Sequence, residues 1–356
     1  MLEETFYLKS APLNLYIKSN CKRLIQAPLR YIKGFLFAFS LVDEEFPRMR
    51  FRNITRFLGA VLLVDFLEEK NISHVHVHFA FGAAGVAIFL QTISNISYSI
   101  SIHGSDVLLP QPFTEEKLQY ARFIISNCKF HIHNLVRRYP SLEKQKFHLV
   151  YLGIDNDSAL WSKQTRIPET SPLRILNVAR LEEVKGHDIL IRACARLKKK
   201  GIVFECRIAG EGSKREEITA LIDKLGLNDS VILLGACYES DVASLFDWSQ
   251  IMVLSSLSEG TPMTIIEAML KARPVVAPRI TAIPEMVIEE ETGFLFTREN
   301  YNELADKLAI LATRPELALR MGREGRKRAQ QMFNIQQNVR RLVPVFEQVI
   351  ASDPSH

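Results

Sequence analysis

Short apolar runs alternate with amphipathic stretches along the C-terminal half of the chain. The runs predict buried strands, and the stretches between them carry apolar residues at helical spacing. The expected strands are 173–179, 203–209, 231–234, 251–254 and 274–277, and the expected helices are 188–199, 214–225, 241–248 and 264–271. This alternation predicts a parallel sheet covered by helices on both faces, whose ligands bind beyond the carboxyl ends of the strands.

The N-terminal half has a less complete version of the same pattern. Its expected strands are 75–79, 98–103, 123–126 and 147–151, and its expected helices are 54–70, 82–94 and 131–139. A polar stretch with two prolines, 156–172, is interpreted as a linker between an N-terminal domain (1–155) and a C-terminal domain (173–332). A last helix within 333–356 is expected to pack back on the N-terminal domain.

Residues 1–50 do not fit the strand–helix pattern. Basic residues alternate there with Leu, Ile, Tyr and Phe, and no acidic residue lies between 18 and 42. The basic residues are Lys18, Lys22, Arg23, Arg30 and Lys33. Two interpretations stay open: an amphipathic segment that lies on an anionic membrane, or a basic solvated helix face packed on the domain.

Composition narrows the class of protein. The 356 residues carry a net charge of +5 and are 47% hydrophobic and 24% charged, which is ordinary for a globular protein with two cores. The basic balance favours an anionic ligand or a membrane surface over nucleic acid, because no nucleic-acid-binding motif is present. Five scattered cysteines, no signal peptide and no apolar run long enough to cross a bilayer predict a cytoplasmic protein, peripheral at the inner face of the plasma membrane if the membrane interpretation holds.

Two glutamates, Glu259 and Glu267, flank what reads as the start of a helix. Thr261 suits the cap of this helix, and Pro262 suits its first turn. Free backbone N–H groups at a helix start bind anions, most often phosphate. A diphosphate between two hydroxyl-bearing sugars would match a carboxylate before the helix start and another about two turns further along. The stretch therefore predicts a nucleotide-sugar site.

Two further groups of residues follow predicted strands. Arg180 and Lys185 come after the first strand of the C-terminal half, where their charges suit a diphosphate leaving group. His103 and Asp106 follow a strand of the N-terminal half, where the histidine suits a sugar hydroxyl or acid–base work. Taken alone, each group favours a structural role. The glutamate stretch on the same sheet edge favours function for Arg180 and Lys185, and Asp106 together with a nucleotide site in the other domain favours function for His103.

The stretch 256–269, with Arg273–Ala277 and Pro284-Glu285 after it, resembles the Glu-x7-Glu signature of family 4 glycosyltransferases. The resemblance includes Ala179-Arg180-Leu181 with Lys185-Gly186, Ala209–Gly212 and Leu234-Gly235, and in the N-terminal half His76–Phe79 and His103–Asp106. It implies the α/β GT-B fold, with two Rossmann-like domains facing across a cleft. It also implies a retaining transferase of the hexosyltransferase type that builds bacterial exopolysaccharide, capsule or lipopolysaccharide.

The resemblance also implies roles for single residues. Glu259 would contact the transferred sugar and Glu267 the ribose, while Arg180 and Lys185 hold the diphosphate and His103 lies by the donor sugar. Further donor-binding residues would be Gly260, Thr261, Pro262, Met263, Gly210, Gly212, Gly235 and Asp106. The implied donor is a UDP- or GDP-sugar and the acceptor a glycan or a lipid-linked glycan. No metal and no other cofactor are implied, and the leaving phosphate would act as the base.

Three patterns are interpreted as structural rather than chemical. His74, His76 and His78 share one face of a strand, but no nearby carboxylate or cysteine completes a metal site. Asp155-Asn156-Asp157 has the Asp-x-Asp form of some metal-dependent glycosyltransferases, but it lies at the head of the linker. Gly210 and Gly212 lack the third glycine of a dinucleotide fingerprint and suggest a tight turn near the nucleobase.

The chain departs from the family pattern in two places, and these departures leave more than one function open. Ile280–Ile283 stands where the family usually has Gly-Gly, and residues 1–50 do not resemble the first strand and glycine loop of the family, so the N-terminal domain is expected to be incomplete. The leading hypothesis is a sugar transferase. The alternative is a nucleotide-sugar-binding remnant without turnover. A phosphorylase or epimerase of the same fold is disfavoured because phosphorylases of this fold are much longer chains.

Overall fold

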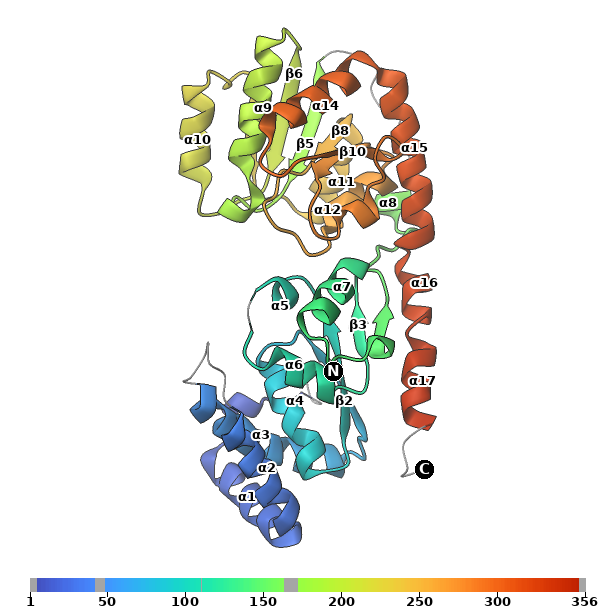
Figure 1. Ribbon diagram of the computed structural model, residues 1–356. Helices are drawn as coiled ribbons and strands as arrows, with labels where there is room; N and C mark the ends of the chain where they lie inside the picture. The colour runs from blue at the N-terminus through green and yellow to red at the C-terminus, as the bar shows by residue number, and fades with distance from the viewer. Residues whose placement is uncertain (1–4, 42–48, 110, 163–171, 352–356) are drawn as a thin grey trace. The chain divides into compact units, whose positions relative to one another are not determined.

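The computed structural model describes residues 5–41, 49–109, 111–162 and 172–351 (Figure 1). The chain divides into two compact units: Met1–Val150 with Val343–His356 is unit 1, and Tyr151–Leu342 is unit 2. Part of the expected linker, 163–171, lies outside the described residues, as do 1–4 and 42–48 of the basic segment. The first part of that linker instead forms α8 (Ala159–Ser162), whose Trp161 is buried in a core of unit 2.

Unit 2 holds a six-stranded sheet in the order β10-β9-β8-β5-β6-β7, and all its strand pairs are parallel. The strands are β5 (Leu173–Val178), β6 (Phe204–Ala209), β7 (Val231–Gly235), β8 (Ile251–Val253), β9 (Val275–Pro278) and β10 (Gly293–Phe296). From β5 the chain continues through β6 and β7 toward one edge of the sheet, and from β8 it continues through β9 and β10 toward the other edge. Ligands of such sheets bind where the order reverses, here beyond the carboxyl ends of β5 and β8.

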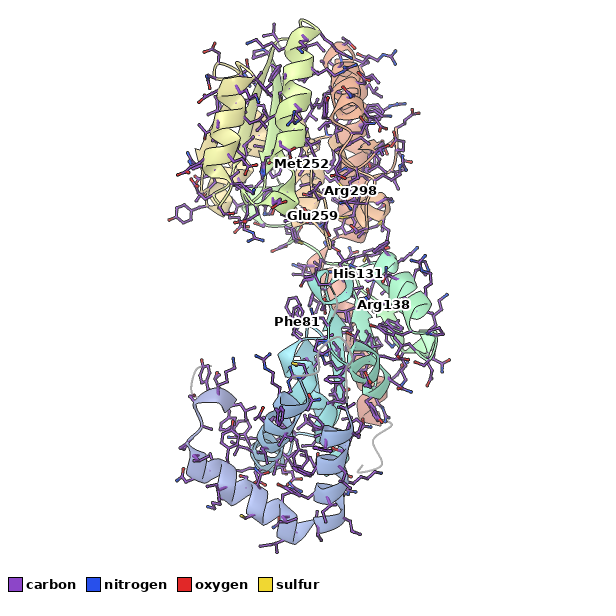
Figure 2. All side chains as sticks on the ribbon, turned by 60° about the vertical axis from the view of Figure 1, so that its left-hand side comes forward. Phe81, His131, Arg138, Met252, Glu259 and Arg298 are labelled. Carbon is purple, nitrogen blue, oxygen red and sulfur yellow. The ribbon has the colours of Figure 1, made fainter. Side chains whose placement is uncertain are left out.

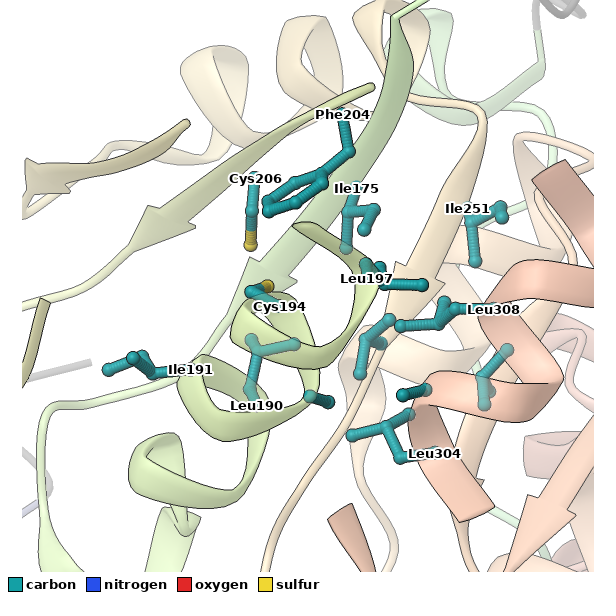
Figure 3. Packing of buried hydrophobic residues seen from close by; sticks show 14 of the residues in the cluster. Ile175, Leu190, Ile191, Cys194, Leu197, Phe204, Cys206, Ile251, Leu304 and Leu308 are labelled. Carbon is teal, nitrogen blue, oxygen red and sulfur yellow. The ribbon is translucent and has the colours of Figure 1, made fainter. Parts of the chain in front are cut away.

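Successive residues of these strands belong to opposite faces of the sheet. Ile175 and Ile251 join one buried cluster, whereas their neighbours Leu176 and Met252 join another. Figure 3 shows the first cluster, in which side chains of α9 and α14 pack on the sheet. One face carries α9 (His187–Lys199), α10 (Arg215–Lys224) and α14 (Tyr301–Thr313); the other carries α8, α11 (Glu239–Trp248), α12 (Met263–Leu270), α13 (Ile283–Met286) and the end of α15 (Pro315–Met332).

Unit 1 holds a four-stranded parallel sheet in the order β1-β2-β3-β4. Its strands are β1 (His74–His78), β2 (Ser97–Ile102), β3 (Ile124–Ser126) and β4 (Phe147–Leu149). Its helices are α1 (Leu13–Gln26), α2 (Pro28–Ser40), α3 (Met49–Glu69), α4 (Gly82–Ile93), α5 (Ser105–Leu108), α6 (Thr114–Tyr120), α7 (Lys129–Arg138) and α17 (Val343–Ala351). Side chains of α3 and α4 fill the core between the helices and this sheet.

The three histidines of β1 lie along a row of serines on β2. His74 contacts Ser97 and Ser99 at 2.7 and 2.8 Å, and His76 contacts Ser99 and Ser101 at the same distances. Phe346 of α17 packs against His76, with ring centroids 5.3 Å apart. Within the described ranges, no three His, Cys, Asp or Glu side chains group as metal ligands. The histidine row is an internal contact surface, as the sequence indicated.

The expected strands agree with the structure to within two residues at each end. The expectation of a single last helix within 333–356 is wrong in one respect, because two helices form there, α16 (Ile335–Arg340) and α17. Pro344 is the second residue of α17, where its missing N–H is not needed. The short helices α5 and α6 had no sequence prediction.

Candidate functional site

The loops after β5 and β8 pack on each other by their backbones. The Leu257 N–H donates to the Val184 carbonyl at 2.8 Å, and the Ser255 hydroxyl donates to the Lys185 carbonyl at 3.1 Å. Gly186 has a φ of +57°, and a Cβ there would lie 2.3 Å from the Ser255 carbonyl oxygen. Only glycine allows this approach, so Gly186 fixes the position of Lys185 relative to the second loop.

Lys185 and Glu259 form an ion pair between these two loops. The Lys185 Nζ lies 2.7 Å from the Glu259 Oε1, which also accepts a 2.6 Å hydrogen bond from the Ser256 hydroxyl. Glu259 is 8% exposed and lies beyond the carboxyl end of β8, the strand of Met252 (Figure 2). Its Oε2 has no hydrogen-bond donor in the described part of the chain. The structure thus brings together two residues that the sequence placed on one sheet edge.

The helix after Glu259 begins later than expected. Pro262 is its N-cap residue and Met263 its first residue, so the interpretation of Thr261 as the cap is wrong. The Thr261 hydroxyl is instead buried without a hydrogen-bond partner. The N–H groups of Gly260, Thr261 and Met263 donate no hydrogen bond to any described residue. These unpaired donors at a helix start are suited to an anion.

Glu267 lies four residues into α12, about 6 Å along the axis from Met263 rather than about two turns. Burial, with a smaller contribution from Glu239, raises the pKa of Glu267 to about 7. Its carboxyl group accepts no hydrogen bond from the described residues. A ligand that donates hydroxyl groups to it would stabilise the ionised form.

Arg180 is exposed in the loop after β5 and makes no ion pair within the described ranges. Gly210 and Gly212 pack against this loop. A Cβ at Gly210 would lie 1.9 Å from the Ala179 carbonyl oxygen, and a Cβ at Gly212 would lie 2.4 Å from the Leu181 carbonyl oxygen. Gly235, with a φ of +81°, accepts the Gly210 N–H at 2.8 Å. These contacts are with the chain itself, and the expected part of the three glycines in donor binding stays a prediction.

His103 follows β2 in unit 1 and is half-buried against Phe79, with ring centroids 4.4 Å apart. Burial lowers the pKa of His103, Asp106 opposes this effect and His78 adds to it. Asp106 is 2% exposed, and its two carboxylate oxygens accept the backbone N–H groups of His103 and Ala80 at 2.8 and 3.0 Å. This buried carboxylate therefore holds two loops together, and its expected contact with the donor stays a prediction.

The Asp-x-Asp pattern forms a local turn. The Asp157 N–H donates to the Asp155 Oδ1 at 3.1 Å.

Two residues of the site were not singled out from the sequence. Ser256 holds the Glu259 carboxylate, and its signal was only its place within the motif. Thr281 follows β9 with a φ of +45° and a buried hydroxyl without a partner. Thr281 lies in the stretch Ile280–Ile283 that departs from the family pattern, and its left-handed backbone is one that glycine adopts more readily.

Residues 157–328 match the family model of glycosyl transferases group 1. The chain is 31% identical over 175 residues to a putative colanic acid biosynthesis glycosyltransferase, WcaL, of Escherichia coli K12. That alignment covers 48% of this chain and 43% of WcaL, so it spans less than half of the relative.

Solved structures share the fold at low identity. A glycosyltransferase from Rickettsia africae matches with a TM-score of 0.73 at 20% identity, over 83% of this chain and 82% of that one. HepE of Anabaena, solved with UDP-glucose, matches with a TM-score of 0.67 at 20% identity, over 82% of each chain. Residues 157–328 are thus similar to the glycosyl transferases of group 1, and the two parallel sheets match the fold of solved glycosyltransferases.

Proposed function

We propose that the chain is a retaining glycosyltransferase that moves a sugar from UDP or GDP to a glycan or lipid-linked acceptor in surface polysaccharide biosynthesis in the cytoplasm. The observation that carries this proposal is the Lys185–Glu259 pair, held at the reversal point of the parallel sheet beside a helix start with unpaired N–H groups. The UDP-glucose of HepE and the colanic acid role in the name of WcaL support the choice of donor and process.

Each residue has a defined part in the proposed reaction. Lys185 and Arg180 neutralise the diphosphate as negative charge develops on it, and the N–H groups of Gly260 to Met263 bind its oxygens. The free Oε2 of Glu259 accepts a hydroxyl of the transferred sugar. Glu267 accepts the ribose hydroxyls, which compensates its burial.

The proposed chemistry needs no protein nucleophile. The side chains of Lys185 and Arg180 neutralise the negative charge of the leaving diphosphate. The bond from the anomeric carbon to the diphosphate oxygen breaks, and the acceptor oxygen bonds to the anomeric carbon on the same face. The proton of the acceptor hydroxyl passes to the leaving diphosphate oxygen. His103, neutral at pH 7 because burial lowers its pKa, is proposed to contact the donor sugar.

A transfer assay tests the proposal. The purified chain is incubated with UDP- and GDP-sugars and a panel of glycan and lipid-linked acceptors, alongside Glu259→Ala, Arg180→Ala and the control Lys199→Ala, an exposed cation on α9. We expect transfer by the wild type and the control and a loss of at least 100-fold in both site variants. Undiminished turnover in either site variant would refute the assigned site. Calorimetric UDP binding without transfer or donor hydrolysis would favour a binding remnant.

A further inference from the structure

Helices α1 and α2 present apolar side chains to the outside of unit 1. Leu13 and Ile25 of α1 are 74% and 80% exposed, and Leu29 of α2 is 83% exposed. Further apolar side chains of the two helices that are at least one-third exposed are Ile17, Leu24, Ile32, Phe35, Leu36 and Phe39. Exposed apolar side chains that gather on two neighbouring helices are typical of an interaction site.

The orientation of α1 is inverted relative to an ordinary surface helix. Its inward face is polar: Asn20 donates to the Leu58 carbonyl of α3 at 3.3 Å, and Arg23 pairs with Glu68 of α3 at 2.6 Å. Tyr31 of α2 donates to the same Asn20 at 3.1 Å. Hydrogen bonds and ion pairs therefore fix α1 on α3 with its apolar side turned out. Figure 1 shows α1, α2 and α3 together in blue.

The apolar side of α2 follows one helical face. Leu29, Ile32 and Leu36 repeat at intervals of three and four residues, and Lys33 lies one turn from Leu29 and Leu36. The inward side of α2 is closed by Gly34, where a Cβ would lie 2.8 Å from side chains of Phe57 and Ile93. Gly34 therefore seats α2 tightly on the core, and the Leu29–Leu36 face is left without a partner among the described residues.

The charged residues of α1 and α2 themselves are of one sign. Residues 5–41 contain Lys9, Lys18, Lys22, Arg23, Arg30 and Lys33 and no Asp or Glu. Lys22 and Arg23 are neutralised by Asp65 and Glu68 of α3, whereas Lys18 and Lys33 are exposed and form no ion pair within the described ranges. Two copies of this surface would bring like charges together, which disfavours a dimer through it.

We propose that α1 and α2 dock unit 1 on an anionic lipid bilayer, with the apolar side chains at the level of the acyl boundary and Lys18 and Lys33 against the headgroups. An interfacial helix gains affinity from buried apolar area and from cations near anionic lipid, and exposed lysines beside leucines supply both. In the described part of the chain, no helix is long and apolar enough to cross a bilayer. The proposed mode is lateral docking by two helices. It does not depend on the transfer reaction, so vesicle binding tests it separately from catalysis.

Vesicle sedimentation with the full chain is the test. Vesicles of phosphatidylcholine with phosphatidylglycerol are compared with vesicles of phosphatidylcholine alone. We expect binding to the anionic vesicles only, a drop of at least tenfold for Leu29→Ser/Leu36→Ser, and a drop of about fivefold for each of Lys18→Gln and Lys33→Gln. The matched controls in unit 2 are Val203→Ser, at a residue 66% exposed, and Lys199→Gln. Equal binding by wild type and the leucine variant, or no binding, overturns the proposal.

A tryptophan fluorescence measurement tests the proposal independently of variants that fail to fold. Leu36→Trp is expected to shift its emission to the blue on anionic vesicles, whereas Val203→Trp is not. Equal shifts at both positions, equal binding to neutral vesicles, or self-association of the chain that the leucine variant abolishes would each overturn the proposal.

Discussion

The Lys185 Nζ and the Glu259 Oε1 lie 2.7 Å apart, so the cation proposed for the diphosphate is neutralised by the carboxylate proposed for the sugar. Both side chains are mostly buried, at 19% and 8% exposure. Removal of one partner leaves the other charge buried without compensation. A change in this pair is therefore expected to alter both the free energy of unfolding and the affinity for an anionic donor.

Lys185→Gln is expected to weaken both the site and the donor complex. The free energy of unfolding of the variant should fall by about 1–3 kcal/mol, because the Glu259 carboxylate loses its cation. The dissociation constant for UDP-glucose should rise at least tenfold, because the diphosphate loses a charge-assisted hydrogen bond. Urea unfolding and titration calorimetry measure the two effects. Lys199→Gln is the control, and equal donor affinity in both variants would contradict the proposed role of Lys185.

Donor binding is expected to depend on the ionisation of Glu267. Its pKa of about 7 leaves much of the carboxyl group protonated at pH 6, and the protonated form accepts hydroxyl groups less well. The affinity for UDP-glucose, whose phosphates do not titrate in this range, should fall about tenfold from pH 8 to pH 6. Glu267→Gln should bind weakly at both pH values without this slope. A wild-type affinity that does not change with pH would contradict the assignment.

The same burial makes Glu267 a cost to stability at high pH. A carboxyl group whose pKa is raised in the folded state binds its proton more tightly there than in the unfolded chain. Its penalty is absent below the unfolded pKa of about 4.5 and grows as pH rises to about 7. Glu267→Gln should therefore stabilise unit 2 by about 1–3 kcal/mol at pH 8 and by little at pH 4.5. Thermal unfolding at the two pH values measures the difference, and equal gains would contradict this account.

The sequence located the sheet of unit 2 and its carboxyl edge because its strands are short, mostly apolar runs that alternate with helices, and β8, β9 and β10 are buried at every position. It also located Lys185 and Glu259, because residues that follow neighbouring parallel strands must meet at one edge. The start of α12 was misplaced, because Thr261 has the chemistry of a cap, whereas its hydroxyl is buried without a hydrogen-bond partner among the described residues. Spacing along the chain does not reveal a hydrogen bond such as that from Ser256 to Glu259.

In unit 1 the sequence predicted the strands but did not predict the contacts between loops. Asp106 next to His103 suggested a shared chemical role, but the backbone N–H groups that Asp106 accepts come from His103 and Ala80, and the latter is far away in sequence. The polar inward side of α1 contradicts the interpretation of residues 1–50 as a basic solvated face with its apolar side packed on the domain.

Asp106→Ala is expected to unfold the loop that carries His103. The two backbone N–H groups would lose a charged acceptor in a buried place, which costs about 2–4 kcal/mol of the stability of unit 1. Asp106→Asn keeps one carbonyl acceptor and should cost about half as much. Hydrogen exchange at the His103 and Ala80 amides reports the loss directly. Slow exchange of both amides in the alanine variant would contradict the proposed support.

A comparison of Gly186 with Gly201 separates two effects of an added Cβ. One is the clash between the two site loops, and the other is the strain of a left-handed backbone. Both have positive φ values, +57° and +74°, but a Cβ at Gly186 would lie 2.3 Å from the Ser255 carbonyl, whereas a Cβ at Gly201 meets nothing within 4 Å. Gly201→Ala should therefore cost about 1–2 kcal/mol, which is the strain of a left-handed alanine. Gly186→Ala should cost about 1–3 kcal/mol more, because the clash forces the loops apart.

The two alanine variants should differ in function more than in stability. Separation of the loops breaks the hydrogen bond from Ser255 to the Lys185 carbonyl and moves the Lys185 side chain away from Glu259. We expect Gly186→Ala to lose at least tenfold in sugar transfer at a temperature where it remains folded, while Gly201→Ala keeps the wild-type rate. Because both variants carry the same strain, equal rates would mean that the contact between the loops does not position the ion pair.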